Sequence, residues 1–149
     1  MDYRTLRNSG CAVSAFALGT MTFGAEADEQ ASHDQLDRFV ETGGTLVDTA
    51  DVYAGGASEE IIGRWLADRP ADVTDRVVVA TKGRFPMGDG PNDLGLSRRH
   101  LRDALDASLR RLAGGNNDPH QIARWGGRDP LRQKPMVLWR VSPPGEISS

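Results

Sequence analysis

Apolar and polar residues alternate along the first part of the chain in a way that predicts strands and helices in turn. Short apolar runs at residues 15–18, 45–47 and 76–82 predict three strands. The last run contains four consecutive apolar residues, 77–80, which is typical of a parallel strand covered on both faces. Before these strands, the apolar stretches on either side of Asn8-Ser9-Gly10 predict a short hairpin with glycine at its turn.

Each of the three strands is followed by a stretch with helical spacing. Leu36, Phe39 and Val40 recur at the interval of an amphipathic helix over residues 33–42, which Gly43-Gly44 ends. Serines are placed to cap the three helices at their first residues. These caps are Ser32, Ser58 and Ser97, and the apolar stripes of the second and third helices are Ile61, Ile62, Trp65 and Leu66, then Leu101, Leu105, Leu109 and Leu112.

Three alternations of strand and helix after a hairpin indicate an α/β fold with a parallel sheet. This rhythm is shared by doubly wound sheets and by (β/α)8 barrels, so the pattern by itself leaves both open. No G-x-G-x-x-G motif follows the first strand, and the dinucleotide fingerprint of the doubly wound fold is therefore missing.

The composition is that of a globular protein, with 149 residues, 38% hydrophobic and 26% charged residues, and a net charge of −3. No apolar run approaches the ~18 residues that span a bilayer. The N-terminus has no apolar signal core, so we expect a cytoplasmic protein without a membrane partner. The single cysteine, Cys11, excludes an internal disulfide, and no cluster of histidine, cysteine and carboxylate has the spacing of a metal site.

The proline content and the charge of the sequence change after Leu112, where we place a boundary. Residues 1–112 contain 13 basic and 18 acidic residues, whereas residues 113–149 contain 5 basic and 3 acidic ones and five of the eight prolines. The basic tail has no regularly spaced aromatic residues, so we expect no nucleic-acid binding. We interpret residues 1–112 as a well-patterned unit and residues 113–149 as a degenerate fourth strand followed by an irregular tail.

Three residues at or near the ends of predicted strands suggest acid chemistry. Asp48 ends the second strand, Tyr53 follows in the next loop, and Lys82 ends the third strand. Side chains at the carboxyl ends of neighbouring parallel strands converge on one side of the sheet. A free tyrosine titrates near ~10, but an ammonium group beside a phenol stabilises the phenolate, and a carboxylate can hold that ammonium in place. Such a phenol can protonate a carbonyl oxygen.

Each of these residues also has an ordinary structural interpretation. Asp48 is compatible with a capping carboxylate, Tyr53 with a partly buried aromatic residue, and Lys82 with a solvated strand end. Taken singly these interpretations are favoured, but the three residues together, in this order, favour a reactive site.

The order of these and other motifs resembles the aldo/keto reductases of bacterial type, over residues 1–112. The resemblance implies part of a (β/α)8 TIM barrel, with an N-terminal hairpin and three to four β/α units, truncated relative to a full barrel. The motifs that carry it are Tyr3-Arg4-Thr5-Leu6, Leu18-Gly19-Thr20-Met21 with Phe23-Gly24, Asp48-Thr49-Ala50 with Tyr53, Ser58-Glu59 with Gly63, Thr81-Lys82, and Ser108-Leu109-Arg110-Arg111-Leu112.

By this resemblance Tyr53 is the proton donor, and Lys82 and Asp48 are its tuning pair. Gly19, Thr20 and Met21, together with Asp48, border the nicotinamide. The implied cofactor is NADPH, which supplies the hydride that no side chain can provide. The implied substrates are small aldehydes and ketones.

The resemblance weakens after the third helix. The family has an apolar fourth strand that ends in a catalytic histidine, and Ala123 stands at that position here. Pro119 lies where a central strand seldom tolerates proline, and His120 is poorly placed to replace the missing histidine. The two remaining histidines, His33 and His100, lie at predicted helix starts, where we expect them to be solvated or capping.

A (β/α)8 barrel needs about 250 residues, so three functional interpretations remain. In the first, the chain is a reductase-like fragment that is inactive or has very weak activity alone. In the second, it is a half-barrel reductase that is completed by self-association through an exposed sheet edge or by a partner chain. The third is a non-catalytic binding module.

Overall fold

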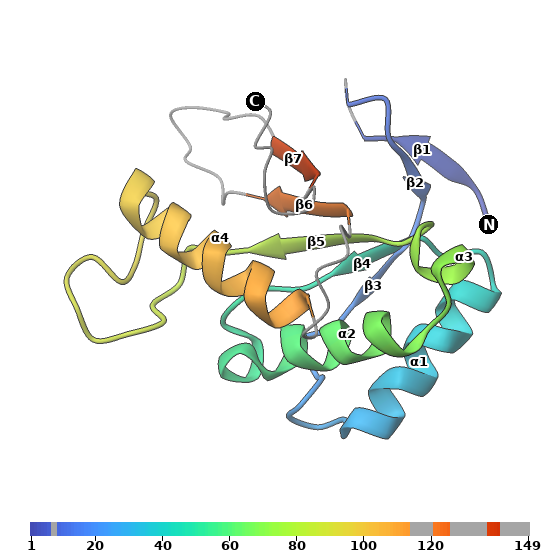
Figure 1. The fold of residues 1–149 in the computed structure, drawn as a ribbon, viewed down its shortest axis with the longest axis horizontal. Helices are drawn as coiled ribbons and strands as arrows, with labels where there is room; N and C mark the ends of the chain where they lie inside the picture. The colour runs from blue at the N-terminus through green and yellow to red at the C-terminus, as the bar shows by residue number, and fades with distance from the viewer. Residues whose placement is uncertain (7–8, 114–120, 126–136, 141–149) are drawn as a thin grey trace.

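The structure, a computed structural model, describes residues 1–6, 9–113, 121–125 and 137–140. Its centre is a five-stranded sheet in the order β3-β4-β5-β6-β7. Strands β3 to β6 are parallel to one another, and β7 is antiparallel to β6 (Figure 1). The strands are β3 (Ala17–Gly19), β4 (Leu46–Asp48), β5 (Val78–Lys82), β6 (Gln121–Trp125) and β7 (Val137–Arg140).

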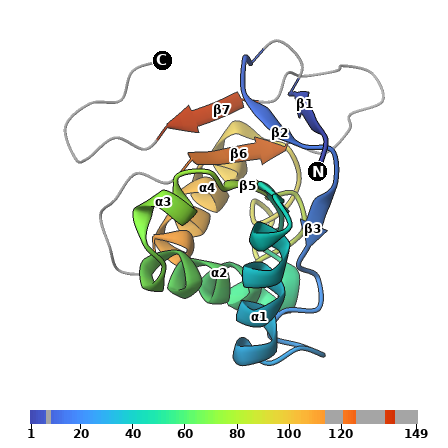
Figure 2. The same ribbon diagram turned by 90° about the vertical axis from the view of Figure 1, so that its right-hand side faces the viewer.

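Helices follow the first three strands of this sheet and lie together on one side of it (Figures 1 and 2). They meet the sheet in one apolar core, to which Leu36, Val47, Trp65, Val79 and Leu112 contribute. The helices are α1 (Glu29–Glu41), α2 (Ala57–Asp68), the short α3 (Ala71–Thr74) and α4 (Arg98–Leu112), and the 3-10 turn η1 (Tyr53–Gly56) precedes α2.

The N-terminal hairpin, β1 (Tyr3–Thr5) and β2 (Ala12–Ser14), lies on the other side of the sheet. Val13 of this hairpin packs against Val78 in a second, smaller apolar cluster. The Ser14 hydroxyl accepts hydrogen bonds from the backbone N–H groups of Thr45 and Leu46 at 3.0 and 3.2 Å. The hairpin therefore closes the amino end of the sheet and leaves its carboxyl end open.

Two of the three predicted helix caps are wrong. Helix α1 begins four residues earlier than expected, because the Asp28 carboxylate accepts from the N–H of Ala31 at 2.8 Å. Ser58 lies inside α2, which follows Gly56 in a left-handed conformation (φ 104°). The cap at Ser97 is confirmed, since its hydroxyl accepts from the N–H of His100 at 3.1 Å.

The two histidines are also placed differently from the prediction. His33 and His100 are both buried, with 9% and 4% of their surface exposed. The Nε2 atom of His33 forms a hydrogen bond with the backbone oxygen of Ile61 at 3.1 Å. His33 therefore joins α1 to α2, and neither histidine is solvated.

The segment after Leu112 contains more regular structure than expected. Strand β6 pairs in parallel with β5, with Ala123 opposite Ala80. The expectation of an irregular tail is wrong for β7, which pairs with β6 in antiparallel register. Pro119 and His120 lie outside the described residues. The sheet remains open, as expected for part of a barrel, and none of the described helices is long and apolar enough to cross a membrane.

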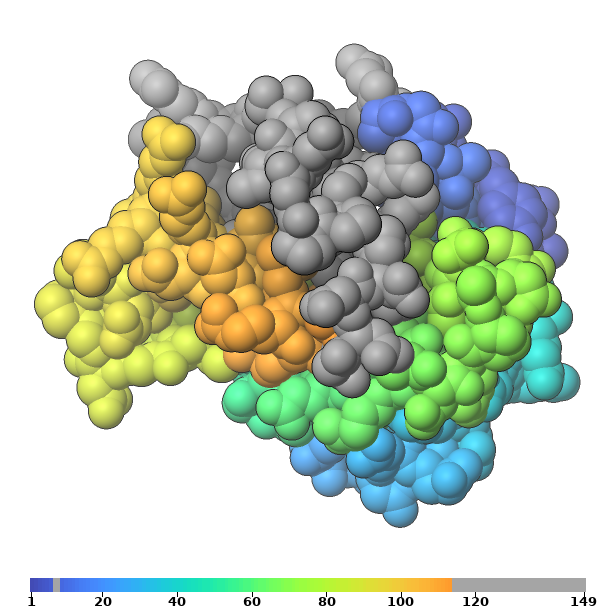
Figure 3. Space-filling view, in the orientation of Figure 1, coloured from blue at the N-terminus to red at the C-terminus, as the bar shows by residue number. Residues whose placement is uncertain are grey.

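Gly63 sets how closely α2 approaches α4, whose surfaces adjoin in Figure 3. A methyl group at Gly63 would overlap the backbone oxygen of Arg111.

A Gly→Ala substitution in an exposed helix raises the free energy of unfolding by ~1 kcal/mol. Gly63→Ala should instead lower it by about 1–3 kcal/mol, because α2 and α4 must move apart to make room for the methyl group. Urea unfolding measures this. Gly19→Ala, where an added methyl group meets nothing within 4 Å, is the control, and a Gly63→Ala chain as stable as wild type contradicts the prediction.

Asp37 joins α1 to α2. Its carboxylate accepts from Arg69 Nε and Nη2 at 2.9 and 2.7 Å and from Trp65 Nε1 at 2.8 Å. The Arg69 hydrogen bonds, with a smaller effect of Trp65, hold the pKa of Asp37 below its ordinary 3.8, against the opposing effect of burial. Because the folded-state pKa is the lower one, this stabilisation is present above pH 3.8 and is lost as the pH falls through the folded-state value.

We therefore expect Asp37→Asn to lower the free energy of unfolding at neutral pH and to do so much less in strong acid. Urea unfolding of both chains at about pH 7 and about pH 2.5 measures the difference. A gap of the same size at both pH values would show that the ionised carboxylate contributes nothing specific.

Candidate active site

Asp48 and Lys82 meet at the carboxyl end of the parallel sheet. Asp48 ends β4 and pairs in register with Ala80, so that Lys82 extends one pleat beyond it on the same face. The Lys82 ammonium lies 2.7 Å from Asp48 Oδ1 and donates to the backbone oxygen of Thr49 at 2.9 Å. Both side chains are partly exposed, at 33% and 40%. The carboxylate and the strand end thus fix a cation at the rim of the sheet.

Tyr53 is brought to this cation by the turn η1. Its N–H donates to the oxygen of Ala50 at 3.2 Å, and three consecutive left-handed residues follow, Ala54, Gly55 and Gly56. Left-handed conformations cost little at glycine and more at alanine, so Ala54 (φ 49°) is held there by its surroundings. The Lys82 ammonium lies over the Tyr53 ring, 5.4 Å from its centroid. The structure therefore brings the three predicted residues Asp48, Tyr53 and Lys82 together.

The residues predicted to border a cofactor lie beside Asp48 but differ in accessibility. Gly19 ends β3 and pairs with Asp48 in register, and Met21 is 67% exposed. Thr20 is fully buried, and its hydroxyl donates to the oxygen of Asp48 at 3.2 Å. Gly19 and Met21 therefore offer free surface next to Asp48, whereas the Thr20 side chain holds the loop in place. Their contact with a cofactor stays a prediction.

Ser58 and Glu59 are site-supporting residues that sequence reasoning did not assign. The Ser58 hydroxyl donates to Thr20, with Oγ–O and Oγ–Oγ1 distances of 3.0 and 2.9 Å, and lies 3.1 Å from Thr49 Oγ1. Glu59 is fully buried behind the site. A signal for this was available, because Ser58 and Glu59 lie four and three residues before Ile62 and so share the apolar face of the helix.

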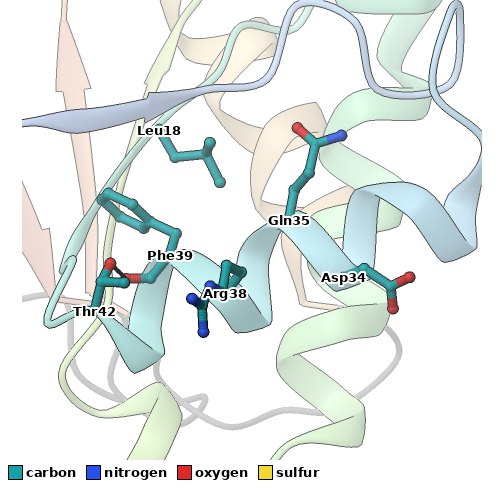
Figure 4. Close-up of a pocket in the computed structure, with 6 residues that line it drawn as sticks. All are labelled: Leu18, Asp34, Gln35, Arg38, Phe39 and Thr42. Carbon is teal, nitrogen blue, oxygen red and sulfur yellow. Dashed lines mark hydrogen bonds between the residues drawn. The ribbon is translucent and has the colours of Figure 1, made fainter.

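A hollow of about 400 Å³ lies apart from this cluster, between β3 and α1 (Figure 4). Leu18 and Phe39 form its apolar walls, and polar side chains line the rest: Asp34, Gln35, Arg38 and Thr42. None of the three clustered residues lines it. Among the described residues, no group of three or more histidine, cysteine and carboxylate side chains is placed to hold a metal ion.

The arrangement at the end of β4 and β5 can donate a proton. The Lys82 ammonium lies between the Asp48 carboxylate, at 2.7 Å, and the Tyr53 ring, whose centroid is 5.4 Å away. The site is partly open to solvent, so a small polar molecule can reach it. Proton donation by a phenol fits the protonation of a carbonyl or a similar oxygen acceptor.

Comparison with known proteins identifies the family. The sequence profile of the aldo/keto reductase family matches residues 15–146, which runs past the boundary placed at Leu112. The oxidoreductase YrpG of Bacillus subtilis is 36% identical over 138 residues, which are 87% of this chain and 42% of YrpG. Norsolorinic acid reductase of Aspergillus flavus is 35% identical over 139 residues, 83% of this chain and 35% of that protein.

A solved structure agrees with the fold. The holo form of an aldo-keto reductase from Bacillus halodurans superposes with a TM-score of 0.61 at 33% identity, covering 75% of this chain and 36% of that one. This likeness confirms the predicted fold class. The chain thus spans well under half the length of these relatives. The profile match over most of its residues and the shared fold place this chain in the aldo/keto reductase family.

Proposed function

We propose that the cluster of Asp48, Tyr53 and Lys82 is the proton-donating part of an NADPH-dependent carbonyl reductase site, and that the 149 residues alone have little or no activity. The observation that carries the first part is the Lys82 ammonium between Asp48 Oδ1, at 2.7 Å, and the Tyr53 ring, at 5.4 Å. A phenol, a cation and a carboxylate in this order match the proton donor and tuning pair of the family that the chain belongs to.

The described residues fit a nicotinamide on one side. Gly19 has no side chain and open space around its Cα, and exposed Met21 lies two residues on. Both are next to Asp48, so a flat ring seated there would place a substrate near Tyr53. When bound, the reduced nicotinamide supplies the hydride.

The chain's own residues then handle the proton. The Tyr53 hydroxyl donates its proton to the carbonyl oxygen of the aldehyde or ketone as a hydride bonds to the carbonyl carbon. The Lys82 ammonium stabilises the phenolate that forms, and Asp48 keeps the ammonium in place. The products are the alcohol and the oxidised cofactor, and Tyr53 regains a proton from solvent.

Two features support the proposal that the 149 residues alone have little or no reductase activity. Ala123 of β6 stands where the family has its catalytic histidine, and alanine cannot orient or protonate a carbonyl. Losing such a group typically costs on the order of 100-fold or more in rate. The sheet is also open, so the cofactor would be held from one side.

A chimera tests the chemistry separately from the activity of this polypeptide. Residues 1–112 joined to the remaining C-terminal part of YrpG should bind NADPH and reduce a small aldehyde, measured by loss of NADPH absorbance. Tyr53→Phe in the chimera should lower the rate about 100-fold or more, while Tyr3→Phe, at the other tyrosine, should leave it unchanged. The 149-residue chain itself should give no measurable heat when titrated with NADPH.

The outcomes separate the two parts of the proposal. A folded chimera that binds NADPH and reduces aldehydes equally well with Tyr53→Phe overturns the assigned role of Tyr53. Micromolar NADPH binding by the 149-residue chain, with aldehyde reduction that depends on Tyr53, contradicts its expected inactivity and leaves the chemistry intact.

A second candidate is a reductase site completed by a second copy of the chain. The observation that favours it is the open edge at β3, where Phe16 is 73% exposed and the hollow beside Leu18 and Phe39 adjoins the strand. An unpaired edge strand is a template for pairing with another chain. Two copies joined there would cover apolar surface that one copy leaves open.

This candidate predicts a dimer that forms with rising protein concentration. Gel filtration over a wide concentration range should then show a shift to smaller elution volumes, which Phe16→Ser weakens. Phe85→Ser is the control, because Phe85 is also exposed, at 58%, but lies in the loop between β5 and α4. A chain that elutes as a monomer at every concentration excludes the second candidate.

A further inference from the structure

A buried polar cluster lies behind the Tyr53 turn, between α2, α4 and the end of β5. Glu59, in the first turn of α2, has no exposed surface. Its carboxylate accepts from the Thr81 hydroxyl at 2.5 Å and from Arg111 Nε at 2.7 Å. Removing one partner of a buried ion pair is strongly destabilising, because it leaves an uncompensated charge. The place of Glu59 therefore depends on both partners.

Each partner of Glu59 adjoins one member of the candidate site. Thr81 is 2% exposed and directly precedes Lys82 in β5, so fixing Thr81 fixes the strand end from which the ammonium extends. Arg111 packs against Gly56, the last residue of the Tyr53 turn. A Cβ at Gly56 would lie 3.0 Å from Arg111 Cδ, and its φ of +104° leaves the position to glycine. Glu59 thus links the Lys82 strand to the Tyr53 turn.

Asp51 connects the same two segments from the other direction. Its N–H donates to the backbone oxygen of Lys82 at 2.9 Å. Its side chain is 1% exposed, and in the described part of the chain neither carboxylate oxygen has a hydrogen-bond partner. Burial, and then the nearby Glu59 carboxylate, raise the pKa of Asp51, while the backbone N–H of Val52, then Arg111 and His100, act in the opposite direction. Arg111 is hydrogen-bonded to Glu59 and lies near enough to Asp51 to act on it electrostatically.

We propose that Glu59 is a positioning residue, which holds the Tyr53 ring against the Lys82 ammonium through its hydrogen bonds to Arg111 and Thr81. The inference rests on the proposed function only in that Tyr53 and Lys82 are the reacting pair. The contact that Glu59 maintains, from ammonium to ring, is a property of the chain without cofactor or substrate.

The ring contact can be measured directly by NMR. Lys82 and Lys134 are the lysines of the chain, so lysine-labelled protein gives two sets of side-chain signals, which Lys82→Arg assigns. Because Lys82 lies over the face of the Tyr53 ring, its ε-methylene protons should be shifted upfield, and Tyr53→Leu should abolish that shift. We expect Glu59→Gln to remove most of the same shift.

Matched variants distinguish positioning from a general loss of stability. Asp37→Asn breaks a partly buried carboxylate–arginine pair elsewhere and should leave the Lys82 shift unchanged. Thr81→Val, which removes the hydroxyl donor, should reduce the shift, whereas Thr81→Ser, which keeps it, should preserve it. If Glu59→Gln does not fold, the comparison of Thr81→Val with Thr81→Ser tests the proposal by itself.

Several results would overturn the proposal. It is wrong if folded Glu59→Gln and Thr81→Val both retain the wild-type Lys82 shift, or if Asp37→Asn reduces the shift as much as they do. It is also wrong if wild type and Tyr53→Leu show the same Lys82 signals. None of these readouts uses NADPH or an aldehyde, so failure of the reductase proposal leaves a positive result for Glu59 standing.

Discussion

The parallel register of β4 and β5 is the constraint on which the candidate site depends. Side chains alternate between the two faces of a strand, so a slip of one residue would turn every side chain of β5 to the opposite face. In the register Asp48 opposite Ala80, Lys82 falls on the same face as Asp48 and one pleat further on. The same register turns Thr81 toward the helices and Glu59. One pairing therefore decides both the Asp48–Lys82 contact and the buried bond between Thr81 and Glu59 behind it.

The side of the sheet that carries the helices explains why this register is stable. Val47 and Val79 point into the core formed with Leu36, Trp65 and Leu112. A slip of β5 by one residue would turn the Lys82 side chain, in place of Thr81, toward the helices. The close approach of α2 and α4 at Gly63 brings Arg111 within reach of Glu59. Apolar burial thus holds the helices against the sheet. The buried ion pair of Glu59 and Arg111 holds the orientation of α2 relative to the strand ends.

Sequence reasoning identified what depends on periodicity and missed what depends on individual polar contacts. The strands, the hairpin and the three main helices follow from apolar spacing, and the grouping of Asp48 with Lys82 follows from their places at strand ends. The start of α1 did not follow, because Asp28 and Ser32 are both good caps and Ala31 is the only apolar residue in the turn between them.

Burial of polar residues was the other limit. Ser58 was assigned to a cap, His100 to a cap or the surface, and Glu59 received no structural role, because these residue types are usually exposed. Their burial depends on partners far away in the sequence, such as Thr20 for Ser58 and Arg111 for Glu59. Strand β7 was missed because the stretch around it has few apolar residues and no clear period, and it is a strand through its pairing with β6.

The location of the polar contacts also shows which part of the fold holds the candidate site in its geometry. The candidate site and the residues behind it all come from two consecutive β/α units, β4 with α2 and β5 with α4, between Asp48 and Arg111. Their geometry is fixed by neighbouring strands and by two packed helices, and needs no closed barrel. Binding of a dinucleotide differs from this, because a cofactor that contacted Gly19 and Met21 alone would keep most of its surface in solvent. The order of the Asp48, Tyr53 and Lys82 cluster and the completeness of a cofactor site are therefore separable properties in this fold.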